Sequence, residues 1–204
     1  KTQAALLEVM EEAAVTVDGV RHELEPPFVV VATMNPVEQA GTYALPEAQL
    51  DRFLMKTSLG HPDRETTVSL LAESATRDRS VNVQAHITPQ VVVDMTALAA
   101  TVHVDAAILD YVARLAERTR IEDGVELGVS LRGCLALTRC AKTWAAGHGR
   151  AAVIPDDIKQ LATPVFSHRI LLTPDAQFHG VRQEAIIAKV LAAEAPPVER
   201  GAEA

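Results

Sequence analysis

The sequence predicts a mainly helical protein with a small α/β portion at its N-terminal end. Nearly all β-type signals lie in the first 60 residues: an Asp-Gly hairpin pattern over 15–24 and an unbroken apolar run over 28–32. Beyond the break at Gly60-His61-Pro62, apolar residues recur at helical spacing. Aromatic residues make up only 3% of the chain, so the core must consist mostly of Ala, Val, Leu and Ile, as is typical of packed helices.

Four elements are expected in the N-terminal portion. A helix over 4–13 follows from apolar residues at i, i+3, i+4 and i+7 counted from Leu6. A hairpin over 15–24 turns at Asp18-Gly19. Residues 28–32 are apolar without alternation, which is typical of a strand covered on both faces in a parallel sheet. A last short strand is expected over 54–59.

The C-terminal portion is expected to be entirely helical. Helices are predicted over 63–77 and 88–100, from 105, over 131–146, from 155 as a short helix, and over 181–193. Asp63, Thr88, Asp105 and Ser130 are the expected N-caps. The dipeptides 163–164 and 173–174 each contain a proline and are expected to interrupt the chain.

Particular faces of two of these helices are expected to be buried. The first helix should bury Val68, Leu71 and Ala72, and the last should bury Ile186, Ile187 and Val190, which its spacing places on one face. Residues 196–204 are expected to form a disordered tail.

Composition limits the function classes. The net charge of −8 argues against a protein whose main role is to coat nucleic acid. Cys134 and Cys140, six residues apart, suggest neither a disulfide nor a metal site, and the histidines show no zinc-ligand spacing. No apolar run is long enough to span a membrane and no signal-peptide pattern is present, so a cytoplasmic location is expected.

Candidate functional residues follow the predicted parallel strand. Asn35 precedes Pro36, which holds Asn35 extended at the carboxyl end of the strand, the edge where ligands bind in open α/β sheets. Arg52 lies fewer than twenty residues later, between apolar anchors. An amide at a strand tip and a downstream arginine suit a phosphate site. Taken singly, Asn35 could instead cap a turn and Arg52 could form a surface ion pair.

The run ATMNPVEQAGTYALPEAQLDRF closely resembles the segment from sensor 1 to the arginine finger in the MoxR-type AAA+ ATPases. The likeness continues in weaker form to about residue 175. The resemblance implies the end of an AAA+ α/β core over residues 1–60, with parallel strands, and a helical lid over 61–195. It also implies that Asn35 is the sensor-1 residue and Arg52 the arginine finger.

The resemblance implies a third site residue, Arg132, as the sensor-2 arginine that binds nucleotide at the start of a lid helix. Here the chain departs from the family pattern, because Leu131 stands where proline is usual. The glycine-rich phosphate loop and the magnesium-binding acidic motif are absent from these residues. The chain is therefore expected to be the C-terminal part of an ATPase that uses ATP and Mg²⁺, and to bind ATP poorly by itself.

The resemblance further implies a homo-oligomeric ring, a hexamer, that remodels or matures an unidentified partner protein, with no nucleic-acid partner. Other functions stay open at this point. The chain could be a non-catalytic helical interaction module, or part of a magnesium-chelatase-like ATPase. A helix-rich DNA-binding domain is a third possibility, against which the acidic balance weighs. Arg150, His168 and Arg169 could form a modest basic patch with Arg139 and Lys142, although solvated side chains are the simpler interpretation.

Overall fold

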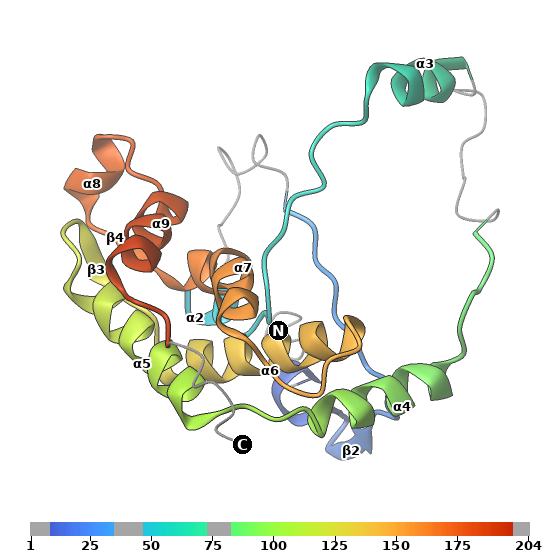
Figure 1. The fold of residues 1–204 in the computed structure, drawn as a ribbon. Helices are drawn as coiled ribbons and strands as arrows, with labels where there is room; N and C mark the ends of the chain where they lie inside the picture. Colours follow the sequence, from blue (N-terminus) through green and yellow to red (C-terminus); the bar gives the residue numbers. More distant parts are fainter. Residues whose placement is uncertain (1–8, 35–46, 73–82, 198–204) are drawn as a thin grey trace.

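The computed structural model describes residues 9–34, 47–72 and 83–197 (Figure 1). Residues 9–12 are helical, and the elements that follow are β1 (Ala14–Val17), β2 (Val20–Glu23), α2 (Glu47–Leu50), α3 (Arg64–Ala72), α4 (Pro89–Ala100), α5 (Ala106–Ile121), β3 (Val125–Leu127), α6 (Leu131–Gly147), α7 (Pro155–Phe166), the 3₁₀ helix η3 (Ser167–Arg169), β4 (Leu171–Leu172), α8 (Pro174–Phe178) and α9 (Gln183–Ala193). The expected fold class, mainly helical with a small β-containing N-terminal portion, is confirmed.

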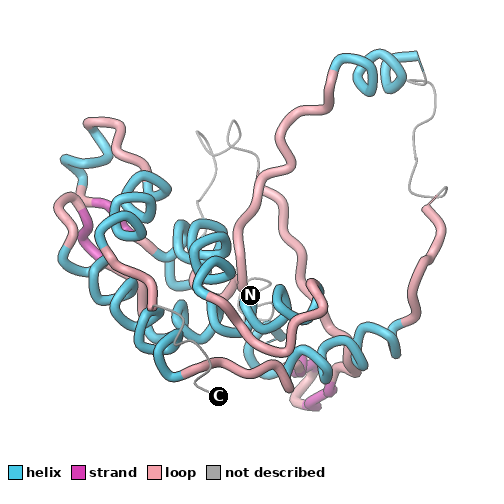
Figure 2. The backbone as a smooth tube through the Cα atoms, in the orientation of Figure 1, coloured by secondary structure: helices cyan, strands magenta, loops and turns pink. Residues whose placement is uncertain are grey.

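The helices α5, α6, α7 and α9 form the body of the molecule, whereas α3 stands well away from it (Figure 1). A long loop leads from the body out to α3, and the described residues just before α4 are also loop, as the colouring of Figure 2 shows. These packed helices are therefore the part of the structure that can fix the side chains of a functional site.

The hydrophobic core of the described residues lies wholly within the C-terminal portion. Its members run from Val102 to Val190, and the largest fully buried side chains are those of Tyr111, Phe166 and Leu115. Most core members come from α5, α6, α7 and α9, whose apolar stripes face one another, and the others are Val102, Val129, Val153, Ile170, Leu172 of β4 and Ala176 of α8. Ile186, Ile187 and Val190 of α9 are buried, as predicted.

The predicted hairpin is present. Strands β1 and β2 pair antiparallel, with Ala14 opposite Glu23 and Val17 opposite Val20. The turn residues Asp18 and Gly19 have φ of 51° and 80°, the left-handed values that a two-residue hairpin turn requires. Gly19 adopts this conformation without strain because it lacks a Cβ.

The predicted parallel strand over 28–32 does not form among the described residues. These residues are extended but unpaired, and Val29 and Val31 are 71% and 85% exposed. Residues 54–59 likewise carry no strand. A strand requires a neighbour to receive its backbone hydrogen bonds, and in the described part of the chain the sheets contain only β1–β2 and β3–β4. The expectation of parallel strands is therefore wrong for this structure.

Helix α3 differs from its prediction. It begins after Asp63, whose carboxylate accepts a hydrogen bond from the Thr66 N–H at 2.7 Å, as the cap prediction requires. Its expected inner face is not buried, however: Val68 and Leu71 are 58% and 68% exposed, because α3 stands alone. The rest of the expected helix, from 73 to 77, lies outside the described residues, as do 198–204 of the expected tail.

The caps of the later helices are mostly as predicted. Thr88 accepts from the Val91 N–H and Asp105 accepts from the Ala107 N–H. Ser130 stands at the N-cap of α6 but makes no cap hydrogen bond with its side chain. Thr173 caps α8 through the Ala176 N–H.

Two details of the C-terminal portion overturn their predictions. Pro164 does not interrupt the chain but lies in the last turn of α7. Pro164 has no N–H to donate to the Gln160 carbonyl, so α7 loses one helical hydrogen bond, but only two residues from its end. Strands β3 and β4 form a small antiparallel sheet, so this portion is not all-helical. Three-residue and two-residue strands are too short to show periodicity in a sequence.

Both cysteines are free thiols, as predicted; Cys140 is buried and Cys134 half-buried. None of the helices in the described residues is long and apolar enough to cross a membrane. The expected boundary at residue 60 stays a prediction.

Candidate functional site

Arg52 lies immediately after α2, where its backbone N–H donates to the Gln49 carbonyl at 3.3 Å. Its side chain is 24% exposed, and its Nη1 lies 3.2 Å from Oε2 of Glu11. The surface ion pair considered from the sequence is therefore present, with a partner distant in sequence. The Arg52 side chain is thus mostly buried, and 24% of its surface is open to solvent.

Arg132 lies in the first turn of α6 and is 46% exposed. Its Nη2 donates to the other oxygen of the same carboxylate, Oε1 of Glu11, at 2.8 Å. Leu131, in the place where proline is usual, occupies the first position of α6 and is 71% exposed. The arginine projects from the helix start in spite of this departure.

Glu11 therefore bridges the two guanidiniums that the sequence had singled out. The hydrogen bond from Arg132 lowers the pKa of Glu11, and the charges of Arg52 and Arg132 add to this shift. The carboxylate is ionised at neutral pH and binds one arginine with each oxygen. Glu11 was not predicted as a site residue, because only the apolar positions of the predicted helix over 4–13 were considered.

Asn35, the third predicted site residue, lies outside the described residues. The structure therefore brings together Arg52 and Arg132 but says nothing about their relation to Asn35.

A buried arginine holds the backbone beside Arg52. Arg169, whose side chain is 2% exposed, donates from Nε to Oδ1 of Asp51 at 2.9 Å. Its Nη2 donates to the carbonyls of Asp51 and Phe53 at 3.1 and 2.7 Å. Its Nη1 donates to the Leu54 carbonyl at 3.1 Å and to the Val165 carbonyl. We call this set the Arg169 clamp.

The sequence had not identified Arg169 as part of the site. The interpretation of Arg169 as a solvated or patch-forming residue is wrong, because it is buried in the clamp. Arg150 also leaves the expected patch, since it pairs with Asp157 through both of its terminal nitrogens. A signal was available in Gly133: a Cβ there would lie 3.0 Å from Cδ of Arg169, so glycine leaves room for the arginine.

His168 joins the clamp from the neighbouring position. Burial lowers the pKa of His168, so its imidazole is neutral at pH 7. Its Nε2 lies 3.0 Å from the Phe53 carbonyl, which can only accept, so Nε2 carries the hydrogen. The Phe53 carbonyl thus receives hydrogen bonds from two adjacent residues of η3.

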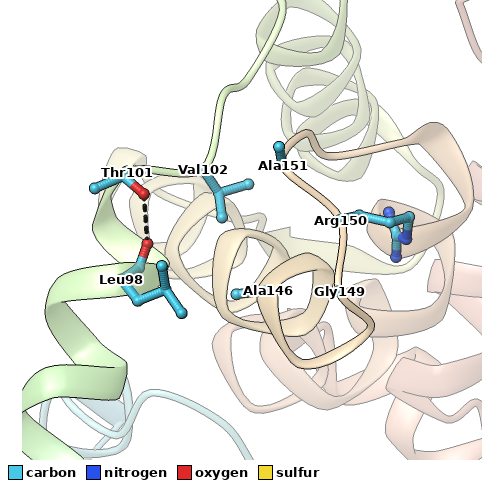
Figure 3. A pocket seen from close by; sticks show the side chains of 7 residues that line it. All are labelled: Leu98, Thr101, Val102, Ala146, Gly149, Arg150 and Ala151. Carbon is cyan, nitrogen blue, oxygen red and sulfur yellow. Dashed lines mark hydrogen bonds between the residues drawn. The ribbon is translucent and has the colours of Figure 1, made fainter.

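The surface of the described residues includes a hollow away from Arg52 and another near it. One, of about 280 Å³, lies between the end of α4 and the turn after α6, where Leu98, Val102 and Ala146 line it together with Arg150 (Figure 3). None of the site arginines lines it. The other, of about 380 Å³, lies beside the clamp, with Leu50, Lys56 and His168 in its wall. Among residues 9–34, 47–72 and 83–197, no group of three or more potential ligands could hold a metal ion.

The electrostatic balance at the site favours an anion. Three guanidiniums, those of Arg52, Arg132 and Arg169, are matched here by two carboxylates, those of Glu11 and Asp51. Arg169 is fully engaged in the interior, whereas Arg52 and Arg132 meet at the accessible side. Planar guanidiniums bind phosphate oxygens as readily as carboxylate oxygens.

Two family models match the chain. The model of the ATPase family associated with various cellular activities matches residues 1–55, which include Glu11, Asn35 and Arg52. The model of the AAA lid domain matches residues 117–190, which include Arg132 and Arg169. The two halves of the site thus fall in the two matched regions.

The chain is also similar to full-length relatives. It is 42% identical over 202 residues to the uncharacterized protein YeaC of Bacillus subtilis, covering 99% of this chain and 63% of that protein. It is 34% identical over 215 residues to the chaperone MoxR1 of Mycobacterium tuberculosis, covering 97% of this chain and 54% of that protein. The protein MoxR of Paracoccus denitrificans is 32% identical over 209 residues, which cover 92% of this chain and 60% of that protein.

A solved structure shares the fold. The crystal structure of a protein from Cytophaga hutchinsonii, described as a candidate ATPase, superimposes with a TM-score of 0.86 at 34% identity, covering 96% of this chain and 62% of that one. The chain thus spans between about half and two thirds of the length of the proteins that it matches.

Proposed function

The chain belongs to the MoxR-type AAA+ ATPases, and from that premise we propose that it forms the C-terminal part of an enzyme that hydrolyses ATP at the subunit interfaces of a ring. Arg52 is the arginine finger and Asn35 the sensor-1 residue in this proposal. Arg132 is the sensor-2 arginine of the lid. The ring is a hexamer, and it uses the energy of ATP to remodel or mature a partner protein.

One observation carries the proposal: the guanidiniums of Arg52 and Arg132 meet on a single small anion, the carboxylate of Glu11. A terminal phosphate is also a small anion with several oxygens, and it can take the place of that carboxylate. Because the two arginines lie together on one chain, they address the same nucleotide. If Arg52 acts on the ATP of the adjoining subunit, Arg132 acts there too.

Hydrolysis of ATP needs little covalent catalysis by the protein. Transfer of a phosphoryl group to water requires an oriented water and positive charge near the γ-phosphate oxygens, where charge spreads in the transition state. Arg52 and Arg132 supply that charge. Asn35 supplies a neutral amide that can hydrogen-bond the attacking water or the γ-phosphate without adding charge.

ATP and Mg²⁺ are the cofactors that this function implies. The donor set of Arg52 and Arg132 fits a phosphate, whereas the described residues offer no cluster for Mg²⁺. The printed sequence contains no phosphate loop. We therefore expect the 204-residue chain by itself to bind ATP weakly, and micromolar binding of a fluorescent ATP analogue to it would contradict this.

Substitutions in the full-length protein test the function. Arg52→Ala should lower ATP turnover by about a thousand-fold, the scale of arginine-finger losses, because the transition-state charge is left uncompensated. Arg182→Ala is the matched control, since Arg182 is 77% exposed and pairs only locally with Glu184 among the described contacts. Unchanged turnover in both Arg52→Ala and Asn35→Ala would instead favour a non-catalytic interaction module.

A mixing experiment tests the interface. Subunits carrying Arg52→Ala keep their own ATP site, and subunits carrying Asn35→Ala keep their finger. Combined in one ring, they should form some interfaces in which an intact finger meets an intact site, so part of the turnover should return. Mixtures no more active than the average of the two variants would refute action between subunits.

A further inference from the structure

Hydrogen bonds from the lid hold the backbone on either side of Arg52. Arg169 has five N–H donors, and the structure provides an acceptor for each of them. Four of these acceptors belong to residues 51–54 and the fifth is the Val165 carbonyl of α7. A guanidinium with all its donors engaged has one orientation, so it fixes the groups that it binds.

The contacts fall on both sides of Arg52 and leave Arg52 itself out. Asp51 is bound through its carboxylate and its carbonyl, and Phe53 through its carbonyl. The backbone is thus pinned immediately before and after Arg52. The Arg52 side chain extends from this pinned backbone to Glu11.

Two further bonds extend the attachment. His168 donates to the same Phe53 carbonyl that receives Nη2 of Arg169. The Lys56 N–H donates to the Pro164 carbonyl at 2.8 Å. Pro164 and Val165 carry carbonyls of the last turn of α7, which have no partners within the helix. Residues 51–56 therefore complete the C-terminal end of α7.

We propose that Arg169 is a positioning residue for Arg52: through Asp51, Phe53 and Leu54 it makes the finger peptide part of the lid, and so sets where the finger guanidinium meets the phosphate. The proposal rests on the function proposed above. Arg169 does not touch the nucleotide in it, since its donors are all occupied in the interior. The finger consequently moves with the lid of its own subunit.

The chemistry of the clamp requires arginine. Lysine has three donors on a single nitrogen and cannot span a carboxylate and four carbonyls. Lysine at position 169 keeps the charge opposite Asp51 but leaves several of the carbonyls without a hydrogen-bond donor. The finger peptide is then free to shift, and a displacement of about 1 Å in a catalytic group can cost about 100-fold in rate.

The test compares single and double variants of the full-length ATPase. We expect Arg169→Lys to lower kcat by about 100-fold while leaving KM for ATP nearly unchanged, because only finger placement suffers. In an Arg52→Ala background the same substitution should have no further effect on kcat. Arg182→Lys is the control and should leave both constants unchanged.

A second variant tests the positioning role in case Arg169→Lys, at a buried position, does not fold. Asp51→Asn keeps the size of the side chain and the Asp51 carbonyl, and removes only the charge that faces Arg169. It should lower kcat by less than Arg169→Lys and should also be silent in the Arg52→Ala background. Thermal denaturation of each variant shows whether it is folded at the assay temperature.

The outcomes separate the two proposals. If Arg52→Ala loses turnover while folded Arg169→Lys and Asp51→Asn keep it, the positioning role is wrong and the proposed function stands. If either clamp variant lowers kcat further when Arg52 is already absent, Arg169 acts on something else and the positioning role is also refuted. If Arg52→Ala keeps full turnover, the proposed function fails, and the positioning role fails with it.

Discussion

Replacing Asp157 by asparagine should destabilise the lid through loss of one buried charge. Asp157 is 3% exposed and lies in the first turn of α7. Its two oxygens accept from Arg150 at 2.7 and 2.6 Å, and one of them also accepts from the Ile154 N–H at 2.9 Å. Asparagine has only one side-chain acceptor, so its amide N–H would face a donor of Arg150.

The size of the effect follows from this geometry. Breaking a buried ion pair costs about 3–5 kcal/mol, and the Arg150 side chain, 30% exposed, places this pair at the lower end of that range. We therefore expect a loss of about 3 kcal/mol in the free energy of unfolding at pH 7. In a chain of this size that corresponds to a fall of roughly 6–12 °C in Tm.

The loss should depend on pH in a specific direction. Burial alone would raise the pKa of Asp157, but the hydrogen bonds from Arg150 and the Ile154 N–H outweigh it and lower the pKa. The ionised carboxylate therefore stabilises the fold above the unfolded-state pKa of about 3.9. This contribution disappears as the pH falls through the lower folded-state pKa, so the difference between wild type and variant should shrink there.

Urea denaturation followed by circular dichroism, at pH 7 and at about pH 3, measures both quantities. Asp156→Asn is the matched control: the neighbouring Asp156 is 78% exposed and pairs with Lys159, so its loss should cost about 0.5 kcal/mol or less. Equal losses in the two variants at pH 7, or a loss in Asp157→Asn that is as large at pH 3, would refute the reasoning.

Three more substitutions in the lid should lower the free energy of unfolding, as measured by the same urea titrations. Glu122→Gln removes a buried charge that Lys189 binds at 2.5 Å, costing about 2–3 kcal/mol; because Lys189 lowers the pKa of Glu122, this cost should vanish at acid pH. Gly133→Ala places a Cβ 2.5 Å from Cγ1 of Val129, so overpacking of about 1–3 kcal/mol should exceed the helix-propensity gain. Thr119→Val leaves the buried Val129 N–H without its acceptor and should cost about 1–3 kcal/mol, whereas Thr119→Ser should not.

The helices could be predicted from the sequence wherever an apolar stripe meets a packed neighbour. In α9, Ile186, Ile187 and Val190 follow helical spacing and are buried. Spacing failed for α3, because Val68 and Leu71 have the right period but no described element packs against them. Periodicity reports which residues share a face, not whether anything covers that face.

The candidate site could be predicted only in part, for a related reason. Arg52 and Arg132 were identified from a motif, and Arg132 lies at the start of α6, as its local sequence suggested. Glu11 and Arg169 were not identified, because their roles depend on partners 41 to 121 positions away, and no local pattern encodes such a pairing. From its local sequence, an arginine followed by apolar residues is interpreted as solvated, because the acceptors that surround it in the fold are not evident there.

The distribution of the core explains why the finger peptide depends on the lid. Among the described residues, the hydrophobic cluster runs from Val102 to Val190 and includes nothing from residues 9–72. Residues 51–56 contribute nothing to this cluster, and hydrogen bonds from η3 and the end of α7 attach them to it. Arg169 follows Val165 and Phe166 by four and three residues, and both of these are buried in that cluster. The lid core is thus connected to the backbone on either side of Arg52 mainly through the Arg169 guanidinium, with His168 and the Pro164 carbonyl adding to it, so variants that loosen α7 should also weaken the finger.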